Sequence, residues 1–229
     1  MTSLPELPAN FAAALKLIDD AHAEDPRTAT TTTTTTTSSE DGSEGGGTAV
    51  AVPYELHYAR QMTRWLARRC PDASPTLQLA CRAQHFRRWE TPRDTFAPTR
   101  AGYLAWRSRQ KAQAAAQVSA LLLQQLPSLP QSDVDRVAAL VRKEGLQPSS
   151  APAGVDPDPE TQALEDVACL VFLDGELESF AARGGLGEDK LLGVLRKTWA
   201  KMSPEGRGLA LEMRMSEGAR ELVGRALEG

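Results

Sequence analysis

The sequence predicts an all-α fold, a single compact domain of about seven to nine helices with a disordered insertion rich in Thr, Ser and Gly. Apolar residues recur at spacings of three and four, and cap and turn residues separate the segments that carry them. No stretch shows the strict alternation or the β-branched runs that are typical of strands. With 229 residues, 41% hydrophobic residues and a net charge of -4, the chain is typical of one soluble globular domain.

The N-terminal part is expected to form a short amphipathic helix over residues 8–23, with Asn10 as its cap. Residues 28–47 are almost entirely Thr, Ser, Gly and Glu, and they offer nothing apolar to offset the entropy of ordering them. We therefore divide the chain into an N-terminal helix that packs on the main domain (1–27), a disordered low-complexity linker (28–48) and a main all-helical domain (49–229).

Further helices are predicted wherever an apolar stripe follows a capping residue. The predicted segments are 53–69, 74–89 with Ser74 as cap, 99–126, 132–145 with Ser132 as cap, one that starts at 158, 188–202, one capped by Ser203, and one from Ser216 to 227. In the helix that starts at 158, residues 167–173 are continuously apolar, which indicates a helix covered on most sides.

Several classes of protein are excluded by what the sequence lacks. No window approaches the roughly 20 apolar residues of a membrane span, and the first 25 residues are no secretory signal, so we expect a cytoplasmic protein with no membrane partner. Cys70, Cys81 and Cys169 are an odd number at wide spacing, which excludes a disulfide framework and a structural zinc site. No phosphate-binding glycine loop and no G-x-S-x-G motif is present.

Two adjacent carboxylates, Glu165 and Asp166, come directly before the apolar stretch 167–173 of the most apolar helix. Asp166 shares a stripe with Leu170 and Leu173, so its carboxylate should point toward the core. A buried carboxylate needs a partner, and the candidates are a metal ion, a guanidinium, a histidine or a helix N-terminus. The plainer alternative is a structural ion pair with one arginine.

Two histidines are candidate partners for Asp166. His85 lies on or near the apolar face of helix 74–89, and His57 lies at the edge of the stripe on helix 53–69, whereas His22 should be solvated. Either histidine could instead be a hydrogen-bonded core residue. The hypothesis is a divalent metal held by His85, Asp166 and His57.

This arrangement partly resembles the metal-dependent HD phosphohydrolase fold. In that hypothesis Glu165 or Glu90 would orient the attacking water. The resemblance lacks its defining His-Asp doublet, because Phe86 follows His85.

Positive charge is concentrated in the first half of the main domain. Residues 55–111 contain 12 basic and 4 acidic residues, with aromatic residues between them. Arg88, Arg93, Arg100 and Arg107 would clamp a phosphate, and Tyr103 and Trp106 would stack on a base. The alternative is a set of solvated helix faces. Because the whole chain is acidic, a small anionic or phosphorylated ligand is favoured over nucleic acid.

Four long motifs then occur in order along the chain: residues 82–89 (RAQHFRRW), 100–107 (RAGYLAWR), 165–173 (EDVACLVFL) and 197–203 (KTWAKMS). They resemble the family called domain of unknown function 4202, over nearly the whole chain except the Thr-rich insertion. The resemblance implies a single helical domain and carries no activity with it. In the last motif, Lys197 and Lys201 are expected on a helix surface, where they could pair with the acidic helix nearby.

Two functions therefore stay open. The first is a divergent HD-like metal-binding protein or phosphohydrolase that acts on a small phosphorylated molecule or nucleotide. The second is a non-catalytic module whose arginine and aromatic surface binds a nucleotide, an RNA or an acidic partner.

Overall fold

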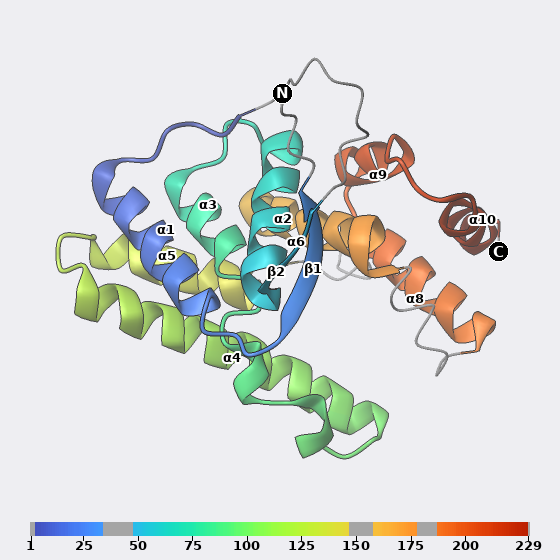
Figure 1. Ribbon diagram of the computed structural model, residues 1–229, viewed down its shortest axis with the longest axis horizontal. Coiled ribbons are helices and arrows are strands. Elements are labelled where there is room, and N and C mark those ends of the chain that lie inside the picture. The colour runs from blue at the N-terminus through green and yellow to red at the C-terminus, as the bar shows by residue number, and fades with distance from the viewer. Residues whose placement is uncertain (1–2, 34–47, 147–157, 178–186, 229) are drawn as a thin grey trace.

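The computed structural model describes residues 3–33, 48–146, 158–177 and 187–228, and it confirms a predominantly helical domain (Figure 1). The helices are α1 (Ala9–His22), α2 (Tyr54–Arg69), α3 (Pro75–Arg82), α4 (Arg100–Gln125), α5 (Gln131–Arg142), α6 (Pro159–Val171), α8 (Glu188–Lys201), α9 (Pro204–Leu211) and α10 (Glu217–Leu227). Two short 3₁₀ turns, Arg88–Glu90 and Arg93–Thr95, follow α3, and a π-helical turn, Phe172–Glu176, follows α6.

A small sheet joins α1 to α2 and corrects the expectation that the chain has no strands. Strand β1 (Thr28–Thr33) pairs antiparallel with β2 (Thr48–Pro53), with Thr28 opposite Pro53 and Thr33 opposite Thr48. Threonine is β-branched and favours extended backbone, so a Thr-rich segment can form a strand. The sequence analysis considered only that this segment lacks apolar residues. Residues 34–47 of the predicted insertion lie outside the described residues.

Helix α6 lies at the centre of the molecule and contacts α2, α3, α5, α8 and α9 (Figure 1). Its apolar side chains Leu164, Val167 and Leu170 have no exposed surface. The prediction that this helix is covered on most sides is therefore confirmed. Glu165 and Asp166, in the middle of α6, therefore lie on a helix that several other helices contact.

Helices α4 and α5 pack against each other, and the first half of α4 extends beyond the body of the molecule (Figure 1). Ala115, Val118 and Leu122, in the second half of α4, are completely buried. In the first half, Tyr103 is 44% and Leu104 is 55% exposed. This half of α4 therefore presents its charged side chains beside the core rather than inside it.

Helix starts mostly agree with the predicted caps. The hydroxyls of Ser74, Ser203 and Ser216 each accept a hydrogen bond from the backbone N–H three residues later. Two predicted caps are wrong. Pro8 precedes the first residue of α1, and the Asn10 side chain, inside the helix, accepts a hydrogen bond from the backbone N–H of Phe11. Helix α5 starts after Pro130, so Ser132 lies inside it.

The predicted helix over 74–89 is too long, because α3 ends at Arg82. His85 and Arg87 adopt left-handed backbone conformations, with φ of 64° and 48°. A β-carbon makes this region costly, so the chain leaves the helix here in a strained turn. Arg88, which the sequence analysis placed on this helix, is therefore positioned by a 3₁₀ turn that follows it.

Two exclusions drawn from composition can be compared with the described residues. Within them, no helix combines the length and the apolar character needed to cross a lipid bilayer. Cys70, Cys81 and Cys169 are free thiols. Burial raises the pKa of Cys169 to about 12, so this thiol stays protonated and serves as a small core residue.

Candidate anion-binding site

Asp166 is completely buried and lies in a fully hydrogen-bonded ion pair. Its Oδ1 accepts from the backbone N–H of Ser203 at 2.8 Å and from Gln162 at 3.0 Å. Its Oδ2 accepts from the Ser203 hydroxyl at 2.6 Å and from Arg69 Nε at 2.7 Å. Of the partners considered for this carboxylate, the structure selects an arginine and the start of α9.

His85 lies in the strained turn after α3 and has a different set of neighbours. Its ring stacks on Tyr58, with centroids 4.1 Å apart, and its Nε2 is 2.6 Å from Arg88 Nη1. A guanidinium can only donate, so Nε2 accepts this hydrogen bond. Burial, and then the charges of Arg88 and Arg107, hold the pKa of His85 well below its usual range, so the imidazole is neutral.

The other residues of the metal hypothesis are also placed apart. His57 lies on α2 with its Nε2 3.5 Å from Gln61 Nε2, and Glu90 accepts hydrogen bonds from Gln113 and Gln117. Over the described ranges, no three His, Cys, Asp or Glu side chains are grouped so that they could hold a metal ion. The structure therefore does not bring His85, Asp166 and His57 together as a ligand set.

Glu165 faces a different environment from Asp166, with a lysine on either side. Lys143 donates a hydrogen bond to its Oε2, and Lys201 Nζ is 3.5 Å from its Oε1. Burial alone would raise the pKa of Glu165, but the charges of Lys143 and Lys201 outweigh it and lower the pKa to about 2. Glu165 is therefore a fixed negative charge that holds two lysines in place, and it cannot donate a proton at neutral pH.

The backbone at Lys143 is also strained. Lys143 is the C-terminal cap of α5 with φ of 60°, a position that glycine commonly occupies. A lysine there costs conformational energy that a glycine would not. The strain places its ammonium group beside Glu165, where only 11% of the Lys143 side chain stays exposed.

More cations surround this pair, and none of them brings a carboxylate with it. The charge of Arg107 acts on Glu165 and His85, and it helps burial to lower the pKa of Arg88 and of Lys111. The groups thus share one electrostatic neighbourhood. We call the following five residues the basic cluster: Arg88, Arg107, Lys111, Lys143 and Lys201. Among the described residues, Glu165 is the one carboxylate within 4.0 Å of a side-chain nitrogen of these five residues, so their positive charges outnumber the carboxylates paired with them.

Arg88 is held in position by contacts, none of which pairs its guanidinium with a carboxylate among the described residues. Its guanidinium lies 4.6 Å from the ring centroid of Trp106, whose Nε1 donates to the carbonyl of Thr91 at 3.0 Å. The Arg88 backbone N–H donates to buried Glu55 at 2.8 Å. A cation with a fixed stem and no paired anion is suited to bind an anionic ligand.

The predicted arginine and aromatic clamp is therefore divided. Arg88 and Arg107 belong to the basic cluster, and Trp106 supports Arg88. Arg93 instead donates to the backbone carbonyls of Phe96 and Ala97, which closes the loop before α4. Arg100 is exposed on the first turn of α4. Tyr103, also exposed, contacts both groups: its hydroxyl accepts from Arg107 Nη1 at 3.5 Å, and its ring centroid lies 6.0 Å from the Arg93 guanidinium.

Three lysines of the basic cluster were absent from the predicted site: Lys111, Lys143 and Lys201. The expectation that Lys201 pairs with the acidic helix is confirmed by its contact with Glu165. The amino-acid composition contained a signal for these lysines. The chain has 20 Arg and only 6 Lys, and three of the six belong to the basic cluster. In an arginine-rich chain, a retained lysine marks a position where a compact charge is needed.

The comparison with protein families gives one match. The model of the family described as Domain of unknown function (DUF4202) matches residues 12–223, which confirms the resemblance seen in the sequence motifs. No match was found among curated proteins or among solved structures. None of these comparisons shows a likeness to the HD phosphohydrolases.

Proposed function

Since the chain belongs to the DUF4202 family, whose description names no activity, we propose its function from the site itself: it binds a small phosphorylated molecule in the basic cluster. The observation that carries the proposal is the excess of cations over carboxylates around Glu165. Like charges held close together destabilise a fold unless something compensates them. A phosphate group supplies the missing negative charge.

The five cations suit phosphate in two ways. Arg88 and Arg107 carry planar guanidinium groups that can donate two parallel hydrogen bonds to phosphate oxygens. Lys111 and Lys143 add compact point charges. The backbone strain at His85 and Lys143 places two of the site's side chains before any ligand arrives, which lowers the entropy cost of binding.

Ligand binding without catalysis accounts for the contacts that Glu165 and His85 make. Glu165 is already engaged by two lysines, and His85 Nε2 already accepts from Arg88. Neither group is poised to activate water. The proposal is therefore closer to the non-catalytic module than to the phosphohydrolase, and it selects a small ligand rather than RNA or an acidic protein.

The experiment is calorimetric titration of the full chain with pyrophosphate, a phosphorylated probe without a base or sugar. In the test variant, Arg107→Ser and Lys111→Ser remove two charges from the basic cluster. In the control variant, Arg100→Ser and Arg109→Ser remove two charges from the same helix that lie outside the basic cluster, and all four positions are exposed. We expect the test variant to bind at least about tenfold more weakly and the control to stay within about twofold of the parent.

Two outcomes would overturn the proposal. If pyrophosphate does not bind the parent chain at low ionic strength, the basic cluster is not a phosphate site. If both variants lose affinity equally, the attraction comes from the general charge of α4 rather than from the cluster.

A further inference from the structure

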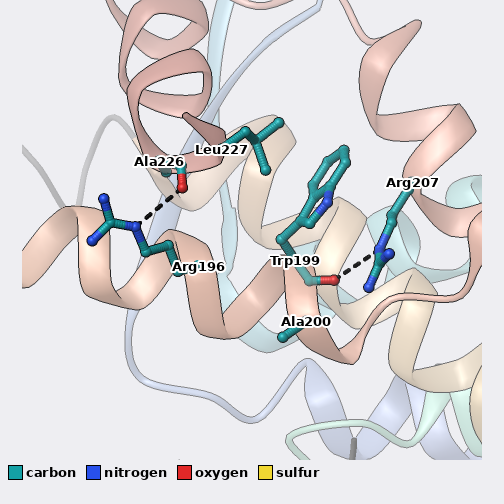
Figure 2. Close-up of a pocket in the computed structure, with 6 residues that line it drawn as sticks. All are labelled: Arg196, Trp199, Ala200, Arg207, Ala226 and Leu227. Atoms are coloured by element: carbon teal, nitrogen blue, oxygen red, sulfur yellow. Dashed lines mark hydrogen bonds between the residues drawn. The ribbon is translucent and has the colours of Figure 1, made fainter. Parts of the chain in front are cut away.

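A cavity of about 400 Å³ lies between α8, α9 and α10, and none of its lining residues belongs to the basic cluster. Six residues line it: Arg196, Trp199, Ala200, Arg207, Ala226 and Leu227. Figure 2 shows Trp199 between the two arginines, with Leu227 over one side of the space. The volume lies in the range of pockets that bind small molecules.

Each arginine of this cavity is anchored through one nitrogen only. Arg196 Nε donates to the carbonyl of Ala226 at 3.1 Å, and Arg207 Nε donates to the carbonyl of Trp199 at 3.1 Å. These bonds cap the last turns of α10 and α8. Among the described residues neither guanidinium has a carboxylate within 4.0 Å, so capping leaves both charges uncompensated.

The surface between the arginines is aromatic and apolar. The Trp199 ring is only partly buried, and the Arg207 guanidinium lies 5.8 Å from its centroid. Ala200 and Leu227 add apolar surface and are both exposed. A planar ring could stack on Trp199 while an anionic substituent reaches the outer nitrogens of an arginine.

We propose that this cavity is a second binding site, for a small ligand that combines a planar aromatic ring with an anionic group, either phosphate or carboxylate. The site is independent of the basic cluster, because it shares no residue with it. It therefore stands whether or not the proposed function holds.

The test is calorimetric titration of the Arg107→Ser, Lys111→Ser chain, in which the basic cluster is weakened by the loss of two of its five cations. Four probes separate the ring from the charge: adenosine monophosphate and 2-naphthoate carry both, adenosine carries the ring alone, and inorganic phosphate the charge alone. We expect one of the first two to bind at least about tenfold more tightly than both single-feature probes, and the two together decide between phosphate and carboxylate. Equal binding of all probes, or no binding of the first two, overturns the proposal.

A matched pair of variants locates the binding without disturbing the caps. Ala200 is exposed on α8 and lines the cavity, so Ala200→Glu introduces a negative charge of helix-compatible shape, and Ala200→Lys introduces a similar length with positive charge. We expect Ala200→Glu to weaken binding by about tenfold or more and Ala200→Lys to leave it unchanged or tighter. If the two variants bind alike, the ligand does not occupy this cavity.

Discussion

His22 and Glu55, 33 residues apart, contact each other in the interior of the protein, with His22 Nδ1 3.3 Å from Glu55 Oε2. His22 Nε2 is 2.9 Å from the carbonyl oxygen of Arg82, which can only accept, so Nε2 carries a hydrogen. Both side chains are completely buried. Glu55 Oε1 also accepts a hydrogen bond from Arg27 Nη2 at 3.1 Å. The sequence analysis expected His22 to be solvated, and this expectation was wrong.

The pair supports the candidate site, because Glu55 Oε1 accepts the backbone N–H of Arg88. Glu55→Gln should therefore be tolerated within about 1 kcal/mol, since a glutamine can donate to Nδ1 and still accept from Arg88. Glu55→Ala leaves these groups unpaired and should cost about 3 kcal/mol. Urea unfolding at pH 7 measures both, and equal losses would mean that the negative charge itself is required.

The difference in stability between the parent and Glu55→Gln should also depend on pH. Burial raises the pKa of Glu55 above its ordinary 4.5, despite the hydrogen bond and charge of His22. A raised pKa means that the folded protein favours the protonated carboxyl, so this contribution to stability is present below pH 4.5 and is lost as the pH rises through the folded pKa. The parent should therefore lose stability relative to Glu55→Gln as the pH rises above 4.5. A difference that does not change with pH would contradict the raised pKa of Glu55.

Lys143→Met should destabilise the protein by about 3 kcal/mol, because it removes the closest counter-charge of buried Glu165. Methionine keeps the length and the β-carbon, so the backbone strain is unchanged. Adding Glu165→Leu should restore at least about half of the loss, since no unpaired buried charge then remains. Chemical unfolding of the three variants checks this, and no recovery in the double variant would show that packing dominates.

The lysine pair also predicts acid sensitivity. Because the pKa of Glu165 is lowered to about 2, its contribution to stability is present above its ordinary 4.5 and is lost as the pH falls toward 2. In Lys143→Met one stabilising charge is gone, so the carboxyl should take up its proton at higher pH. The stability that is lost between pH 4.5 and about 2 should therefore be smaller in the variant, and urea unfolding at several pH values should show the difference between parent and variant narrowing as the pH falls.

Gly206→Ala should destabilise the protein by about 2 kcal/mol, because an added β-carbon would lie 2.6 Å from Asp166 Cγ. Gly208 lies on the same helix with no atom within 4 Å of such a carbon. Gly208→Ala should therefore stabilise α9 by about 0.5–1 kcal/mol through helix propensity. Thermal unfolding of the two variants should give shifts of opposite sign. A stable Gly206→Ala protein would mean that the Asp166 ion pair can move.

Lys111→Gln should leave the ligand-free protein as stable as the parent or more stable. Burial, and then the charges of Lys143 and Arg107, lower the pKa of Lys111, so the folded state disfavours its charge. The same variant should lose about half or more of the rise in melting temperature that pyrophosphate produces. Arg109→Gln, an exposed position on the same helix, should keep the full rise.

Much of the fold depended on local rules that a sequence contains. The helices capped by Ser74, Ser203 and Ser216 were predictable because a cap needs only a hydroxyl and a backbone N–H three residues later. The burial of α6 followed from its apolar period. The paired ends of the Thr-rich insertion were missed, because a strand becomes stable only with its partner, and Thr28 pairs with Pro53 across the whole insertion.

The sequence by itself determined the helical class, most helix starts and the fact that a buried carboxylate in the middle of α6 needs a partner. Only the tertiary structure decided which partners the two carboxylates there have. Asp166 binds Arg69, 97 residues away, whereas its neighbour Glu165 faces Lys143 and Lys201. Successive residues on a helix point about 100° apart, so two adjacent carboxylates meet different elements. Which elements these are depends on how distant helices pack, and no local pattern in the chain records that.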